Sequence, residues 1–176
     1  MVIWFIGLSG SGKTTLSKLV HDRLKPKLPN LVRLDGDIFR AVFGNDVDHT
    51  VEGRRKNAER LSNISKYLSD QGIHVIAAVL SIFPEWQEWN RNNIKDYAQV
   101  YIKASLEVLK KRDGNNLYAP ALEGKLKNVV GVDIPFPEPA NTDMVIDNNR
   151  DKDDMGDDVR RILSLDVIRK AMDKNK

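Results

Sequence analysis

The chain has 176 residues, with 28 Lys and Arg side chains against 25 Asp and Glu side chains, and it contains no cysteine. This length suits one domain, so we expect residues 1–176 to form a single domain. The missing cysteines exclude disulfide scaffolds and thiolate metal sites. The net charge of +3 comes from mixed charges, which argues against a nucleic-acid polymer as partner.

Two apolar runs in the sequence do not have the features of export or membrane segments. Residues 2–8 lack a preceding basic segment and continue into glycines, unlike a secretory signal. Residues 73–83 are too few to cross a bilayer and include His74. We therefore expect a cytoplasmic protein without a membrane partner, in agreement with the absence of cysteine.

Apolar strands alternate along the chain with segments of helical periodicity. Val2–Ile6 is a continuous apolar run, as in a parallel strand that is covered on both faces. Lys13–Leu24 has apolar residues at helical spacing, and Pro26 ends it. Further strands are predicted at 31–34, 73–80, 99–103 and 144–146, and further helices at 38–43, 50–69, 86–97, 106–111 and 157–172. The alternation predicts an α/β fold: a five-stranded parallel sheet with helices on both faces.

Residues 112–142 are rich in Gly, Asn and Pro and show little periodicity. An irregular stretch of this length within a compact domain is typical of a functional lid or a disordered loop. We expect a lid over residues 112–132.

Residues 7–14 read Gly-Leu-Ser-Gly-Ser-Gly-Lys-Thr and match the phosphate-binding pattern G-x-x-x-x-G-K-[ST]. Glycines let the backbone approach phosphate closely, and the helix that follows adds its N-terminal N–H groups and its dipole. Lys13 is expected to contact the β- and γ-phosphates of ATP, and the Thr14 hydroxyl to bind Mg²⁺. The backbone that we expect to hold phosphate consists of Ser9, Gly10, Ser11, Gly12, Lys13, Thr14 and Thr15. A chance Gly/Ser-rich turn is the alternative, and the flanking strand and helix argue against it.

Two carboxylates follow the second predicted strand, in Asp35-Gly36-Asp37. Such a pair can divide the work of phosphoryl transfer: Asp35 holds Mg²⁺ through water, and Asp37 accepts the proton of an attacking hydroxyl. Arg40, one helical turn further on, is suited to clamp a phosphate or sulfate. A helix N-cap with a solvated Arg40 is the alternative. The third predicted strand carries no acidic residue at its end, which argues against GTPases and motor ATPases.

These motifs, taken with three more, resemble those of the adenylylsulfate (APS) kinases over residues 2–147. The three further motifs are Arg54 and Asn57 for R-x-x-N, Arg112-Asp113 with Leu117-Tyr118 for R-D-x-K-G-L-Y, and Gly131-Val132-Asp133-x-Pro135 for G-I-D-x-P. The resemblance implies a P-loop kinase fold, often dimeric, that phosphorylates a ribose 3′-hydroxyl with MgATP.

The resemblance also implies roles for single residues. Arg40, Arg54 and Asn57 would hold the acceptor nucleotide, and Arg112 would belong to the ATP side of the lid. The other residues expected to bind the acceptor are Asp37, His49, Leu80, Ser81 and Val129.

The acceptor side departs from the family pattern. The family usually places the acceptor adenine between two phenylalanines, and His49 and Val129 stand at those places here. An acceptor-site arginine is replaced by Gln87. Losing an aromatic face weakens purine stacking by about 1 kcal/mol per contact. The acceptor is therefore either adenylyl sulfate or, as in a relative of the family, cytidine diphosphoramidate. A kinase of another hydroxyl compound and a nucleotide-binding switch without transfer activity are the remaining alternatives.

Overall fold

The computed structural model describes residues 1–114, 116–149 and 155–174. Within them, five strands form one sheet in the order β2-β3-β1-β4-β5, and every neighbouring pair is parallel. The strands are β1 (Val2–Ile6), β2 (Leu31–Asp35), β3 (His74–Val79), β4 (Tyr97–Lys103) and β5 (Met144–Asp147). The helices are α1 (Lys13–Leu24), α2 (Gly36–Val42), α3 (Val51–Asp70), α4 (Pro84–Asn93), α5 (Leu106–Lys111), α6 (Tyr118–Leu122), α7 (Gly156–Leu163) and α8 (Asp166–Asp173).

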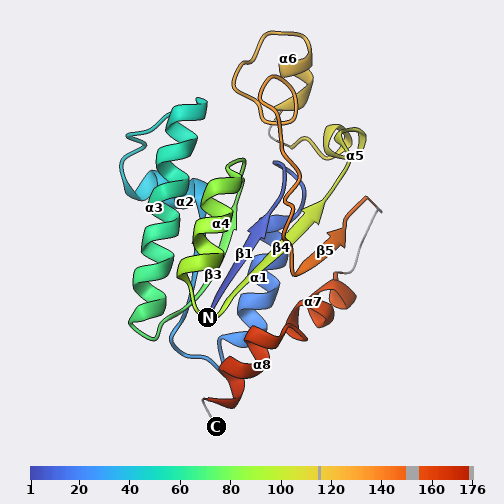
Figure 1. The fold of residues 1–176 in the computed structure, drawn as a ribbon. Helices are drawn as coiled ribbons and strands as arrows, with labels where there is room; N and C mark the ends of the chain where they lie inside the picture. Colours follow the sequence, from blue (N-terminus) through green and yellow to red (C-terminus); the bar gives the residue numbers. More distant parts are fainter. Residues whose placement is uncertain (115, 150–154, 175–176) are drawn as a thin grey trace.

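Helices cover both faces of this sheet, as Figure 1 shows, and the predicted fold class is confirmed. Ile3 and Phe5 of β1 belong to the apolar cluster that contains residues of α1, α7 and α8. Trp4 and Ile6, on the other face of the strand, belong to the cluster that includes Leu61 of α3. Each such fully buried side chain contributes about 1.5–3 kcal/mol to folding. Burial on both faces explains why β1 is an uninterrupted apolar run.

Local caps fix where the helices near the carboxyl edge begin. The Asp35 carboxylate accepts a hydrogen bond from the N–H of Asp37 and caps α2 at 3.2 Å. The Thr50 hydroxyl accepts from the N–H of Gly53 at 3.2 Å and caps α3, so the predicted helix 50–69 is found with Thr50 as its N-cap. Substituting such a cap by Ala typically costs about 1 kcal/mol.

Three predicted elements differ from the structure. The stretch 112–142 is not wholly irregular, because α6 forms where the Asp113 carboxylate accepts from the N–H groups of Leu117 and Tyr118. The predicted helix 157–172 is two helices that break after Leu163, and both place residues in the cluster over α1. The predicted helix 86–97 ends at Asn93, since Ile94 is extended. The predicted lid contains residue 115, and the predicted single domain also contains 150–154 and 175–176, all of which lie outside the described residues.

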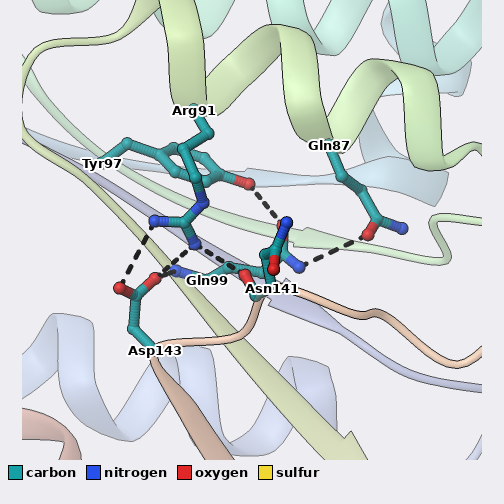
Figure 2. A network of polar contacts seen from close by, with 6 residues as sticks. All are labelled: Gln87, Arg91, Tyr97, Gln99, Asn141 and Asp143. Atoms are coloured by element: carbon teal, nitrogen blue, oxygen red, sulfur yellow. Dashed lines mark hydrogen bonds and ion pairs between the residues drawn. The ribbon is translucent and has the colours of Figure 1, made fainter.

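A polar network joins α4 to β4 and to the residues just before β5 (Figure 2). Arg91 of α4 donates to the carboxylate of Asp143 and to the carbonyl of Asn141, both at 2.7 Å. Asp143 in turn accepts from the backbone N–H of Gln99 on β4 at 2.8 Å. The buried phenol of Tyr97 donates to the Gln99 side chain at 2.9 Å. These bonds fix α4 against β4 and against the chain that enters β5.

The carboxyl ends of the strands face the segment 112–132 and α2 (Figure 1). The strand order reverses at β1, and ligands of open parallel sheets bind beyond the carboxyl ends at such a point. In the part of the chain that the structure describes, no helix is long and apolar enough to cross a membrane.

Candidate active site

A cavity of about 510 Å³ lies at this edge of the sheet. Its walls come from the phosphate loop, the turn after β2, the start of α3, the end of β3 and residues 126–130. Lys13, Asp35 and Asp37 all line it, together with Ser9, Gly10 and Thr14. The two sequence motifs follow β1 and β2, which are separated in the sheet by β3, and they meet in one cavity.

The phosphate loop needs glycine where it turns into α1. Gly12 has φ +101°, a conformation that side chains with a Cβ rarely adopt. A Cβ at Gly12 would also lie 2.7 Å from Nδ2 of Asn148. Any larger residue at this position would displace either the loop or Asn148.

Side-chain donors hold three carbonyl oxygens of the phosphate loop. Nζ of Lys13 donates to the carbonyl of Leu8 at 2.7 Å. Nδ2 of Asn148 donates to the carbonyl of Ser11 at 2.8 Å, and the Tyr118 hydroxyl donates to the carbonyl of Ser9 at 2.7 Å. Asn148 and Tyr118 come from distant parts of the chain, and sequence reasoning did not assign them to the site.

The ammonium group of Lys13 is poorly solvated. Burial lowers the pKa of Lys13 to about 8, although the nearby carboxylates of Asp37 and Asp35 act to raise it. A phosphate group brought next to Lys13 would favour the charged form. In the free protein, the charge of Lys13 is complete well below pH 8 and is lost as the pH rises through that value.

MgATP affinity is therefore expected to weaken with rising pH. Because Lys13 is about one tenth protonated one unit above its pKa, binding at about pH 9 should be roughly tenfold weaker than at about pH 7. Calorimetric titration with MgATP at several pH values measures this. Lys13→Arg is the control, since a guanidinium stays charged over this range. Equal pH dependence in both proteins would contradict the role of Lys13.

The side-chain oxygens of Asp35 and Thr14 lie next to each other. The Thr14 hydroxyl donates to Oδ2 of Asp35 at 3.0 Å, and the other carboxylate oxygen caps α2. The alternative of an N-cap is therefore found for Asp35, whereas Arg40, which that alternative expected to be solvated, is buried. The cap uses one carboxylate oxygen and leaves the other beside Thr14. Mg²⁺ prefers oxygen ligands and usually binds through one or two protein groups, with water and phosphate oxygens completing its shell. One carboxylate and one hydroxyl fit Mg²⁺ that is shared with a nucleotide, because the phosphates would supply further oxygen ligands.

Two arginines, Arg40 of α2 and Arg54 of α3, also line the cavity. Arg40 donates through Nη1 to the carbonyls of Val47 at 2.9 Å and Asp48 at 2.7 Å. Arg54 donates to the carbonyls of His49 at 2.8 Å and Asn128 at 2.9 Å. Among the described residues, neither guanidinium forms an ion pair with a carboxylate. Asp37 and Asp48 lie near enough to act on the charge of Arg54, but neither guanidinium is directly paired, and two such positive charges in one cavity favour an anionic ligand.

His49 lies between these charges and lines the cavity. Burial, followed by the positive charges of Arg40 and Arg54, lowers the pKa of His49, and Asp37 partly offsets this. Its imidazole is therefore neutral at pH 7 and offers both a hydrogen-bond donor and an acceptor.

The structure places the remaining predicted residues differently. Leu80 and Val129 line the cavity, as do Ser9 and Gly10, whereas Ser11, Gly12, Thr15, Asn57, Ser81 and Arg112 do not. Nδ2 of Asn57 donates to the carbonyl of Gly36 at 3.3 Å, next to Asp37. Nη1 of Arg112 donates to the carbonyl of Asn148 at 2.8 Å.

Ser81 is buried behind the cavity wall. Nε2 of Gln87 donates to the Ser81 hydroxyl at 3.3 Å, and Oε1 of Gln87 accepts from Gln99 at 3.4 Å (Figure 2). Gln87 thus ties the end of β3 to β4.

Sequence reasoning also missed part of the cavity wall. Leu117, Lys127 and Asn128 line it. The Asp133 carboxylate accepts from the N–H groups of Asn128 at 2.7 Å and Val129 at 2.6 Å, so it fixes this wall. The G-x-D motif was the available signal, since a short acidic side chain commonly binds nearby backbone N–H groups.

The model of the adenylylsulphate kinase family matches residues 1–147. The chain belongs to this family. A cytidine diphosphoramidate kinase of Campylobacter jejuni is 40% identical over 148 residues, which cover 84% of this chain and 86% of that protein. An adenylyl-sulfate kinase of Staphylococcus carnosus is 35% identical over 149 residues, which cover 84% of this chain and 75% of that protein.

The fold agrees with the family. The APS kinase CysC of Mycobacterium tuberculosis, solved in complex with AMPPNP and APS, superposes with a TM-score of 0.82 at 28% identity, over 96% of each chain. The predicted family is thus confirmed, and the chain is an ATP-dependent phosphotransferase, a kinase of nucleotide-type substrates.

Proposed function

We propose that this kinase transfers the γ-phosphate of MgATP to the ribose 3′-hydroxyl of a nucleotide that carries a charged 5′ group. The observation that carries the proposal is that one cavity is lined by Lys13 and the Thr14–Asp35 pair and also by Arg40 and Arg54. Asp37 lines the same cavity.

The phosphate end stabilises charge on ATP. Residues 9–15 supply backbone N–H groups and the start of α1, and Lys13 supplies a positive charge close to where the γ-phosphate must lie. Thr14 and Asp35, the latter through water, would hold Mg²⁺, which neutralises charge on the transferring phosphate when bound. Arg112, at the start of the segment 112–132, is proposed to serve the ATP side.

Asp37 is proposed to orient the acceptor hydroxyl and to take its proton. Its carboxylate is exposed to the cavity, and its backbone N–H is fixed by Asp35. Proton transfer to a positioned carboxylate contributes about 10²–10⁴ in rate. The hydroxyl oxygen attacks the γ-phosphorus in line with the leaving oxygen of ADP.

The acceptor end recognises charge and a base. Arg40 and Arg54 would bind the 5′ phosphate groups, and Asn57 would hold the turn that carries Asp37 through its bond to Gly36. His49, Leu80 and Val129 would face the base, with Ser81 supporting Leu80 from behind.

Cytidine diphosphoramidate is the acceptor that we propose. No Phe, Tyr or Trp is found among the described residues that line the cavity, so the aromatic pair expected for adenine is missing. Neutral His49 can donate a hydrogen bond to the edge of a small base or accept one from it, which would replace stacking between two phenylalanines. The identity of 40% with the Campylobacter jejuni kinase of that substrate supports this choice.

Adenylyl sulfate is the second candidate. It is favoured by the family match over residues 1–147 and by the similarity in fold to CysC, with its TM-score of 0.82. The two arginines suit its phosphosulfate as well as a diphosphoramidate.

A panel of acceptors tests the proposal. Initial rates with MgATP are measured for cytidine diphosphoramidate, adenylyl sulfate, CDP and ADP. The proposed acceptor should give the highest kcat/KM. A higher value for adenylyl sulfate would favour the second candidate, and no transfer to any nucleotide would contradict the proposed function.

His49→Phe should shift the preference between the two bases. An added aromatic face is worth about 1 kcal/mol to a stacked purine, so the ratio of kcat/KM for adenylyl sulfate over cytidine diphosphoramidate should rise about fivefold. His21→Phe, which makes the same exchange on α1 at a position that does not line the cavity, is the control and should leave the ratio unchanged. An unchanged ratio in His49→Phe would remove His49 from base recognition.

Three broader features complete the proposal. Residues 112–132 act as a lid that excludes water during transfer, which limits wasteful hydrolysis of ATP. The protein is a homodimer, which light scattering after size-exclusion chromatography tests. It works in the cytoplasm, where ATP and nucleotide acceptors are available.

A further inference from the structure

One hydrogen bond joins the segment 112–132 directly to the phosphate loop. The Tyr118 hydroxyl donates to the carbonyl oxygen of Ser9 at 2.7 Å, across 109 positions of sequence. Ser9 and Gly10 line the cavity, whereas Tyr118 does not. The contact therefore lies behind the wall that faces the nucleotide.

Tyr118 is itself held from two sides. Its ring is 1% exposed and packs in a cluster with Leu109 and Val129. Its backbone N–H donates to the Asp113 carboxylate at 2.7 Å. Burial, with a smaller effect of the Asp113 charge, raises the pKa of Tyr118 to about 12, so the hydroxyl remains a donor at neutral pH.

The bond to Ser9 sets the orientation of a peptide group in the phosphate loop. The described residues contain no cis peptide bond, and in a planar trans peptide the C=O and the following N–H point in opposite directions. A Ser9 carbonyl held by Tyr118 therefore turns the N–H of Gly10 away from Tyr118. Gly10 has φ +75°, and neighbouring N–H groups in such a loop converge on an anion.

We propose that Tyr118 is a positioning residue for ATP: through its hydrogen bond to Ser9, it fixes the Ser9–Gly10 peptide in the orientation that binds phosphate. Asp113 supports it by holding the first turn of α6. The arrangement couples the order of the segment 112–132 to the shape of the phosphate loop without a contact between Tyr118 and the nucleotide. This inference rests on the proposed use of MgATP.

Tyr118→Phe tests the proposal, because it removes the hydroxyl and keeps the ring. Loss of one buried hydrogen bond is expected to weaken MgATP binding about tenfold. The dissociation constant is measured by calorimetry without acceptor, and steady-state rates give KM for ATP and for the acceptor that the wild type uses. KM for ATP should rise about as much as the dissociation constant, and KM for the acceptor should stay within about twofold.

Tyr101→Phe is the matched control. Tyr101 is also buried, and its phenol contacts Glu138 at 3.4 Å, away from the phosphate loop. Its removal should leave MgATP affinity unchanged. A merely structural role of Tyr118 would lower the melting temperature and raise both KM values equally, which would overturn the proposal.

A second variant covers the case in which Tyr118→Phe does not fold. Asp113→Asn keeps the hydroxyl of Tyr118 and weakens the hold on α6, so MgATP binding should weaken about two- to threefold. Unchanged MgATP affinity in the folded variants would overturn the role of Tyr118. A wild type that binds MgATP but phosphorylates no acceptor would instead contradict the proposed function and leave this inference standing.

Discussion

Asp37→Asn is expected to lower the turnover number by about 10²–10⁴ while leaving the dissociation constant of MgATP within about twofold. The amide keeps the size of the side chain but does not take a proton. Asp37 is proposed to face the acceptor, and the Thr14–Asp35 pair remains intact, so the nucleotide site should change little although the charge of Asp37 also acts on Lys13. Single-turnover rates and calorimetric titration measure the two quantities separately.

Asp70→Asn is the control for this variant, since Asp70 is exposed at the end of α3 and pairs with Lys66. It should transfer phosphate at the normal rate. Near-normal turnover of Asp37→Asn would show that this carboxylate is not the base.

Lys13→Met is expected to lower kcat/KM for ATP by about 10³-fold, because it removes the positive charge that is proposed to face the transferring phosphate. The same change should not reduce thermal stability. Burial lowers the pKa of Lys13 to about 8, which means that folding disfavours its charge, and an apolar side chain of similar length removes that cost. Kinetics and thermal unfolding of the free protein test the two parts.

Lys110→Met, on the exposed last turn of α5, is the matched control and should retain activity. A clear loss of stability in Lys13→Met would mean that its bond to the Leu8 carbonyl outweighs the burial of its charge. Retained ATP turnover would exclude Lys13 from catalysis.

The first half of the fold could be predicted because its signals are local. β1 is apolar throughout, since both of its faces are covered, and Gly12 marks the turn into α1 by its unusual backbone conformation. Asp35 and Asp37 lie at the end of β2. Because the carboxyl ends of parallel strands lie at one edge of a sheet, their position near Lys13 could be predicted.

The remaining features depend on contacts between distant residues. α6 exists because Asp113 holds two backbone N–H groups, and neither periodicity nor composition shows this. The chain breaks between α7 and α8, and residues of both helices belong to the apolar cluster that contains α1. Asn148 and Tyr118 reach the phosphate loop from positions 137 and 109 residues away, so no local pattern assigns them to it.

Only some of the residues that the family resemblance assigned to the acceptor site line the cavity. Arg40, Arg54, His49 and Val129 line the cavity, whereas Asn57 and Ser81 are buried behind it. A motif fixes the position of a residue in the sequence, but whether its side chain reaches the ligand or supports a neighbour depends on packing. Ser81 illustrates this, because Gln87 takes up its hydroxyl.

The most direct measurement follows the γ-phosphate itself. ATP labelled at the γ-position is incubated with Mg²⁺, the protein and either cytidine diphosphoramidate or adenylyl sulfate, and the products are separated and examined by ³¹P NMR. The label should appear as a phosphate monoester on the ribose 3′-oxygen of the acceptor, and Asp37→Asn should form this product about 10²–10⁴ times more slowly. Label that remains in ATP or appears only as inorganic phosphate, with both acceptors present at saturating concentration, would contradict transfer to a nucleotide hydroxyl in this cavity.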